Sequence, residues 1–169
     1  DAGRVGQAGG RIAPAAPARR NAGDGIMTGD APLWLLVAST TRGVLVTLKR
    51  DGRPQLSNVG YAFDGDHRTA LVSTTADRAK THNLRRDPRC SLYVSAPDFG
   101  AYAVVEANAS LGPVAARIDD SVTDQLVEHY AGIRGEHPDW DEFRAAMVAE
   151  RRLLVRLDLT RVYGWAGQA

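Results

Sequence analysis

The chain has 169 residues and a formal net charge of +1 at pH 7, and 44% of its residues are hydrophobic. This length lies within the roughly 100–200 residues of one domain and predicts a single hydrophobic core. The hydrophobic content argues against wholesale disorder. The balanced charge excludes a global basic field that would collect nucleic acid or anionic membranes, so any anion site must be local.

The first part of the chain, residues 1–30, is rich in Gly, Ala, Pro and Arg and has almost no bulky apolar side chain. Such a segment cannot bury enough surface to offset its ordering entropy. We therefore expect a disordered tail over residues 1–30 and a folded domain over residues 31–169. Met27 lies just before the first apolar run, which makes the preceding residues a candidate upstream extension.

Membrane insertion and export find little support in the sequence. The longest apolar stretch, residues 33–38, is far shorter than the roughly 20 residues that span a bilayer. Arg19-Arg20 is followed by Gly and Asp, where an export signal has an apolar segment. We expect a cytoplasmic protein with no membrane or nucleic-acid partner. Cys90 is the only cysteine and lies in an apolar run, which favours a buried, unreactive thiol.

The sequence pattern of the folded part predicts a mainly β protein with short helices, which is an α+β fold. Turn residues and alternating apolar positions predict strands over residues 43–48, 54–63, 69–74, 89–96, 102–111 and 153–162. Helical periodicity and capping residues predict helices over residues 32–39, 77–86, 119–131 and 140–150. Asp51-Gly52 predicts a hairpin turn, and we expect the first three strands to form a meander. Antiparallel strands with inserted helices are typical of a small barrel.

Three donor residues lie close together at the start of the second predicted helix: Arg78, Lys80 and Asn83. They follow a strand that ends in Ser73, Thr74 and Thr75. Cationic and hydroxyl donors beside free helix amides suit a phosphate dianion. The alternative is a solvated basic helix face, and the spacing alone does not decide between the two.

A second polar group, Gln55, Ser57 and Asn58, lies along the predicted strand over residues 54–63. These amides and the hydroxyl would suit a heterocycle bound against a barrel wall, and an exposed strand face is the alternative. No metal site is expected, because the four histidines lack paired spacing. Acidic residues over residues 136–142 are better explained as a helix start than as metal ligands.

Three segments, residues 51–59, 78–88 and 162–164, together resemble the pyridoxamine-phosphate-oxidase-like split β-barrel superfamily. The similarity runs from about Thr40 to Trp165 and is strongest to the actinobacterial branch that uses the deazaflavin coenzyme F420. The resemblance implies an antiparallel six-stranded split β-barrel of the FMN-binding type. It also implies a homodimer with two cofactor sites in grooves between the subunits.

The resemblance implies a role for each candidate residue. Arg78, Lys80 and Asn83 would hold the cofactor phosphate, while the polar residues of the two strands would line the ring and ribityl chain: Gln55, Ser57, Asn58, Ser73, Thr74 and Thr75. The loop over residues 98–102 and Trp165 would approach the partner's cofactor. The sequence lacks the arginine-containing segment after Trp165 that binds substrate phosphate in the true oxidases, so vitamin B6 oxidation is not expected.

The activity that the resemblance implies is hydride transfer between reduced F420 and an organic small molecule. An FMN-dependent oxidase or reductase and a non-catalytic cofactor carrier or sensor are the alternatives. The residues reveal no clear catalytic acid or base. Tyr61 and Tyr102 are candidates to deliver a proton, and packing is the competing explanation for both.

Overall fold

The computed structural model describes residues 29–166, so most of the predicted tail, Met27 included, lies outside the described residues. The elements in chain order are α1 (Ala31–Ala38), β1 (Arg42–Leu48), β2 (Pro54–Gly60), β3 (Ala62–Asp64), β4 (Thr69–Thr75), α2 (Ala79–Arg86), β5 (Arg89–Ser95), β6 (Tyr102–Leu111), α3 (Ser121–Arg134), α4 (Trp140–Ala149) and β7 (Arg152–Trp165). Across residues 29–166, every helix is too short or too polar to cross a membrane.

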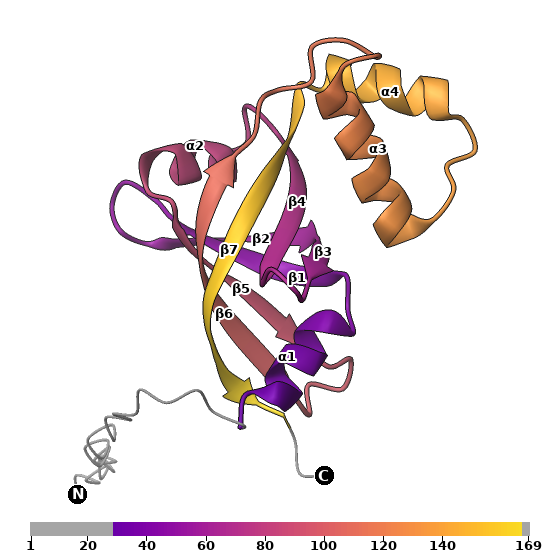
Figure 1. Cartoon of the computed structure of the whole chain (residues 1–169). Coiled ribbons are helices and arrows are strands. Elements are labelled where there is room, and N and C mark those ends of the chain that lie inside the picture. The colour runs from indigo at the N-terminus through magenta and orange to yellow at the C-terminus, as the bar shows by residue number, and fades with distance from the viewer. Residues whose placement is uncertain (1–28, 167–169) are drawn as a thin grey trace, which may run out of the picture.

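The strands form one antiparallel sheet of seven strands in the order β2-β1-β5-β6-β7-β4-β3. Its two edge strands, β2 and β3, follow each other in the chain and are separated only by Tyr61. Because one residue spans only about 3.5 Å, the two edges must lie next to each other. The sheet therefore curls, and in Figure 1 the long strands β6 and β7 cross the molecule as strongly twisted ribbons.

The structure confirms a mainly β fold with four helices and corrects two predictions. The predicted strand over residues 54–63 is broken at Tyr61, so the sheet has seven strands where six were expected. Both pairings of the predicted three-strand meander are present, β1 with β2 and β3 with β4, but the break at Tyr61 places them at opposite edges of the sheet, so the meander is not continuous. Periodicity alone could not reveal this corner, since the residues on both sides of it remain extended.

Tyr61 holds the corner between the two edges in place. Its side chain is fully buried, and its hydroxyl donates a hydrogen bond of 2.6 Å to the backbone oxygen of Val37 in α1. Its backbone N–H donates to the oxygen of Thr41 at 2.9 Å. Burial raises the pKa of the Tyr61 phenol, which keeps it protonated as a donor. The side chain is therefore structural, in agreement with the packing alternative for this tyrosine.

The main core lies inside the curled sheet and is covered at one end by α1. Alternate side chains of the central strands, such as Leu45, Leu92 and Leu157, are fully buried there. Cys90 is buried in this core as expected, and burial raises the pKa of its thiol to about 12. A thiol in such a setting stays protonated and unreactive at neutral pH.

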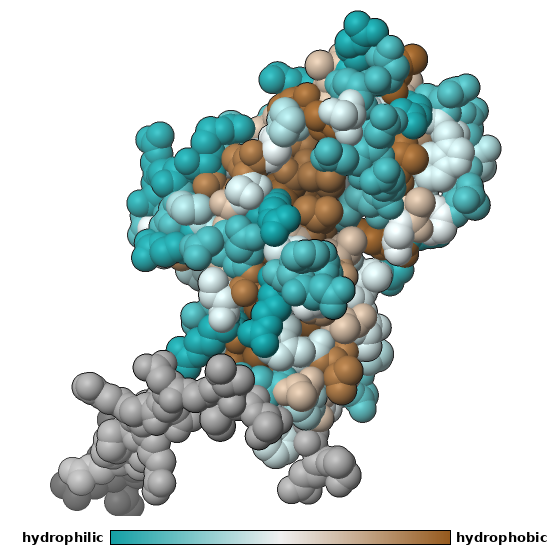
Figure 2. All heavy atoms as spheres, viewed as in Figure 1, coloured by the Kyte–Doolittle hydropathy of each residue, from teal (hydrophilic) through white to brown (hydrophobic). Residues whose placement is uncertain are grey.

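A second, smaller core joins the pair of helices α3 and α4 to the sheet. Leu126, Phe143 and Met147 from the helices pack there with Leu154 of β7. Figure 1 shows both helices together at one end of the molecule, beside β3 and β4. In the same view, Figure 2 shows apolar surface over β4 next to α3, so the surface between the sheet and the helices is not uniformly polar.

We predict that Tyr61→Phe lowers the free energy of unfolding by about 1–2 kcal/mol, because it leaves the buried Val37 oxygen without its donor. Urea denaturation measures this change. Tyr163→Phe is the matched control, since Tyr163 is exposed. Equal stability of the two variants would contradict the structural role given to the Tyr61 hydroxyl.

Candidate functional site

Three positively charged side chains gather where β4 ends and β7 begins. The strands pair antiparallel with Thr75 opposite Arg152, and the Arg152 Nη1 donates to Ser73 Oγ at 3.3 Å. Arg78 is the N-cap residue of α2, and Lys80 lies in its first turn. We call Arg78, Lys80 and Arg152 the cation cluster.

The charges of the cation cluster act on one another. The pKa of Lys80 is lowered, first because the side chain is half-buried and then because Arg78 and Arg152 repel its charge. Arg152 is partly neutralised by Glu150, with its Nε 2.8 Å from the carboxylate. Among residues 29–166, neither Arg78 nor Lys80 forms an ion pair within 4.0 Å. A bound anion would relieve this repulsion.

Asn83 and Gln55 meet in an internal network behind the cation cluster. Asn83 is 7% exposed, and its Nδ2 donates to Thr47 Oγ1 at 3.0 Å and to Gln55 Oε1 at 2.7 Å. Both amide hydrogens are therefore used, and Arg86 donates to its Oδ1 at 3.2 Å. Asn83 thus ties α2 to β1 and β2 and fixes the helix that carries Lys80.

A pocket of about 820 Å³ lies next to the cation cluster, and it is lined by Arg152 of the cluster and by Ser73, which accepts a hydrogen bond from Arg152. The start of β1 and the end of β2, including Asn58, form one wall, and α3 and α4 form the other. The volume lies within the range of roughly 300–1,000 Å³ that is usual for small-molecule and cofactor sites.

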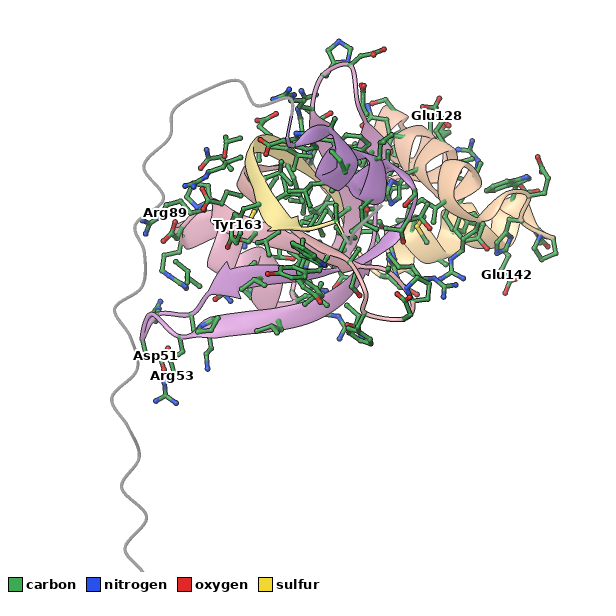
Figure 3. The ribbon with its side chains drawn as sticks, turned by 90° about the horizontal axis from the view of Figure 1, so that it is seen from below. Asp51, Arg53, Arg89, Glu128, Glu142 and Tyr163 are labelled. Atoms are coloured by element: carbon green, nitrogen blue, oxygen red, sulfur yellow. The ribbon has the colours of Figure 1, made fainter. Side chains whose placement is uncertain are left out.

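His129 of α3 lines this pocket, although most of its side chain is buried. The residue is 8% exposed, and its Nδ1 is buried without a hydrogen-bond partner among the described residues. Burial, and then the charge of Arg152, lower the pKa of His129 to about 4, so its ring is neutral at pH 7. The preceding residue, Glu128, points away from the sheet in Figure 3, as the helical turn between the two positions requires.

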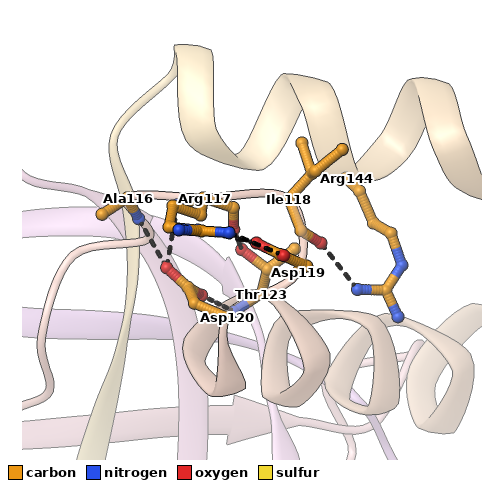
Figure 4. Close-up of polar contacts among 7 residues, drawn as sticks. All are labelled: Ala116, Arg117, Ile118, Asp119, Asp120, Thr123 and Arg144. Carbon is orange, nitrogen blue, oxygen red and sulfur yellow. Dashed lines mark hydrogen bonds and ion pairs between the residues drawn. The ribbon is translucent and has the colours of Figure 1, made fainter.

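The start of α3 is fixed by a polar network, drawn in Figure 4, which sets the position of His129. Asp120 accepts hydrogen bonds from the N–H groups of Thr123, Ala116 and Arg117 at 2.7–2.9 Å, and these bonds lower the pKa of its carboxyl. Arg144 of α4 donates to the oxygen of Ile118 at 2.9 Å. The network joins both helices to the loop that precedes them.

Comparison with known proteins identifies the family. The family model described as pyridoxamine 5'-phosphate oxidase matches residues 35–166, which is most of the chain. The chain belongs to the pyridoxamine 5'-phosphate oxidase family. This agrees with the superfamily that the sequence segments indicated.

Solved structures with the same fold include proteins of different kinds. An F420 reductase matches with a TM-score of 0.58 at 19% identity, covering 76% of this chain and 94% of its own. A heme binding protein from Mycobacterium smegmatis has a TM-score of 0.60 at 21% identity, covering 83% and 54%. HutZ, the heme storage protein of Vibrio cholerae, has a TM-score of 0.57 at 16% identity, covering 81% and 94%. These likenesses support the family fold.

Within this family fold, the structure brings only some of the predicted site residues together. Ser73, Arg78 and Lys80 lie at the cation cluster, and Thr75 pairs with Arg152 beside them. Thr74 is buried on the opposite face of β4, as strand alternation requires.

The predicted polar residues of β2 also lie on both faces of their strand. Gln55 and Ser57 are half-buried on one face of the strand, and Asn58 is exposed on the other, where it lines the pocket. Only Asn58 of the three therefore lies on the face that lines the pocket. Consecutive strand residues point to opposite sides of a sheet.

Sequence reasoning missed Arg152 and His129. Arg152 reaches the site only because β7 pairs with β4, a long-range contact that no local pattern encodes. A signal for His129 was present, because it falls one helical turn after the apolar Leu126 and before Ile133. A histidine on the buried face of a helix merits attention when the fold also places it against a pocket.

We predict that His129 makes the protein less stable as the pH falls from 6.5 to 4. In this window the unfolded chain binds a proton at His129 that the folded chain does not, because the folded pKa is lowered to about 4. The loss reaches about 3 kcal/mol near pH 4 and is absent above pH 7.

Urea denaturation at several pH values measures this slope. His129→Leu should flatten the slope, whereas the control His82→Leu, at an exposed position of α2, should keep it. A slope that survives in His129→Leu would show that other groups cause it.

Proposed function

We propose that the protein is an F420-dependent oxidoreductase that transfers a hydride between the deazaflavin and an organic small molecule, and that it works as a homodimer. The observation that carries this proposal is the cation cluster at the side of a pocket of about 820 Å³. Membership of a flavin-handling family and the shared fold of an F420 reductase support it.

The residues present fit a phosphate-bearing cofactor. Arg78 and Lys80 supply charged donors that lack an ion-pair partner among the described residues, and Ser73 adds a hydroxyl. Charge-assisted contacts of this kind suit phosphate oxygens. Asn83 would act by holding α2 in place through Thr47 and Gln55, and its direct contact with phosphate stays a prediction.

When bound, the cofactor would supply the hydride chemistry, and the protein would supply binding, orientation and exclusion of water. The cation cluster would hold one end of the cofactor. The wall formed by α3 and α4, with Tyr130, Phe143 and Met147, would present apolar surface to a flat ring. FMN offers the same phosphate and a similar ring, so it is the competing cofactor.

The proposed dimer rests on an apolar row across the outer face of the sheet. Directly paired residues share a face, and the pairing register links Val44 to Tyr93, Tyr93 to Val104 and Val104 to Tyr163. Trp165, paired with Tyr102, extends the row and is 54% exposed.

Val44 and Tyr93 of this row also line the pocket. A second copy packed on the row would therefore cover the apolar surface and add a wall to the site. Cytoplasmic location belongs to the same proposal.

We predict that the protein sediments at twice its 18.2 kDa chain mass. Tyr163→Glu, with Tyr163 labelled in Figure 3, should shift it toward monomer because a charge enters the apolar row. Leu35→Glu is the control, since Leu35 is an exposed apolar residue of α1 outside the row. A monomeric wild-type protein, or equal effects of the two changes, would contradict the proposed interface.

Fluorescence titration of the protein with F420 and with FMN tests the cofactor. We expect tighter binding of F420, and we expect Lys80→Ala to weaken it by about 1.5–3 kcal/mol, because a charge-assisted contact is lost. Lys49→Ala is the matched control, because Lys49 is the only other lysine and lies exposed at the hairpin turn.

The outcomes of the titration separate the alternatives. Tighter FMN binding would replace F420 with FMN, and binding of neither would end the proposal. Stopped-flow mixing of the reduced complex with quinones and enones distinguishes an enzyme from a carrier. Oxidation no faster than that of free cofactor would favour a carrier.

A further inference from the structure

A buried threonine, Thr81, attaches the first turn of α2 to the sheet. Arg78, the N-cap residue, makes no side-chain capping hydrogen bond, whereas Asp120 and Asp139 cap α3 and α4 through their carboxylates. Thr81 is fully buried, and its Oγ1 donates a hydrogen bond of 2.8 Å to the backbone oxygen of Thr75. A buried hydroxyl, rather than a capping side chain, therefore fixes the start of this helix.

The acceptor of this bond belongs to the strand pair that carries one member of the cation cluster. Thr75 is the last residue of β4 and lies opposite Arg152 of β7. Ser73, two residues earlier in β4, accepts a hydrogen bond from Arg152. The bond from Thr81 to Thr75 thus joins the helix whose start bears the other two cations to the strands that position Arg152.

The other hydrogen bonds of α2 lead to a different part of the sheet. Asn83 donates to side chains of β1 and β2, and Arg86 donates to the backbone of β1. Within residues 29–166, Thr81 is the one side chain of α2 that forms a hydrogen bond with β4. Asn83 and Arg86 would therefore keep the end of the helix in place when Thr81 is changed, while its first turn could shift.

The first turn of α2 needs such an attachment because the cations around it repel one another. Lys80 is half-buried, and the charges of Arg78 and Arg152 both act on it. This repulsion pushes the start of α2 away from β7, and the bond of Thr81 opposes the displacement. Charge-assisted bonds to one phosphate need donor distances of about 2.7–2.9 Å, so the separation of the three cations decides how well they bind it.

We propose that Thr81 is a positioning residue of the anion site, and that its bond to Thr75 sets the separation between the cations of α2 and Arg152. The identification of the anion as the cofactor phosphate rests on the proposed function. Thr81 is fully buried and does not reach the anion, so it acts through Arg78 and Lys80. A threonine with only a structural role would stabilise the fold without affecting these cations, and measurements on variants separate the two explanations.

The chain offers a matched control for Thr81. Thr123, near the start of α3, is also fully buried, and its Oγ1 donates at 2.8 Å to the backbone oxygen of Arg117, again six residues earlier in the chain. Thr81→Val and Thr123→Val each remove one buried hydroxyl and nearly keep the side-chain shape, so we expect similar decreases in melting temperature. Thr81→Ser retains the hydroxyl and should retain the properties of the anion site.

Lysine side-chain NMR with inorganic phosphate as the probe tests the proposal without the cofactor. Lys49 and Lys80 are the only lysines, so Lys80→Ala assigns their two Cε resonances. In Thr81→Val we expect the pKa of Lys80 to rise toward the ordinary lysine value, because the helix start moves into solvent and away from Arg152. The affinity of the protein for phosphate, followed by the Lys80 resonance, should fall about tenfold. Thr123→Val and Thr81→Ser should leave both quantities as in the wild-type protein.

The positioning role and the proposed function can fail separately. If F420 binds but Thr81→Val changes neither the pKa of Lys80 nor the phosphate affinity, the positioning role is wrong while the proposed function stands. Equal changes in Thr123→Val would also overturn it, as would a wild-type protein whose Lys80 resonance does not respond to phosphate. If Thr81→Val weakens phosphate binding but neither F420 nor FMN binds, Thr81 still positions an anion site, and the proposed cofactor is wrong.

Discussion

The architecture depends on one covalent constraint, namely that a single residue, Tyr61, joins the two edge strands of the sheet. This short link forces the sheet to curl. Curling brings the end of β2 near β4, where the pairing of β4 with β7 places Arg152 beside Ser73 and Thr75. The pocket between the β1–β2 hairpin and α3 follows from this closure, so the buried hydrogen bond of Tyr61 supports the site as well as the fold.

Two side chains of the site, Lys80 and His129, are held in surroundings that are energetically unfavourable for them. Lys80 is half-buried among like charges, and His129 is buried with an Nδ1 that has no hydrogen-bond partner within residues 29–166. Both arrangements reduce stability, and a bound anion at the cation cluster would relieve the first of them. Folded domains tolerate such costs when neighbouring contacts fix the residues, as Asn83 does for α2 and Asp120 does for α3.

Local chemistry made much of this structure predictable from the sequence. Gly52, with φ of 79°, provides the turn expected at Asp51-Gly52, and Asp120 and Asp139 cap the helices predicted nearby. The Tyr61 corner and the bonds of Asn83 were not predictable, because they depend on contacts between distant segments. The basic segment around Lys80, which we propose to hold the cofactor phosphate, was identified from residue types and family resemblance, while Arg152 and His129 required the strand pairing and the pocket.

The central claim is that the cation cluster holds the phosphate of a flavin-type cofactor. A crystal structure of the protein with F420, supplemented by one with FMN, tests it most directly. The account predicts phosphate oxygens within hydrogen-bond distance of Lys80 and Arg78, with the ring extending into the pocket lined by Asn58 and Arg152. A phosphate bound elsewhere, with the cation cluster contacting only solvent, would contradict it.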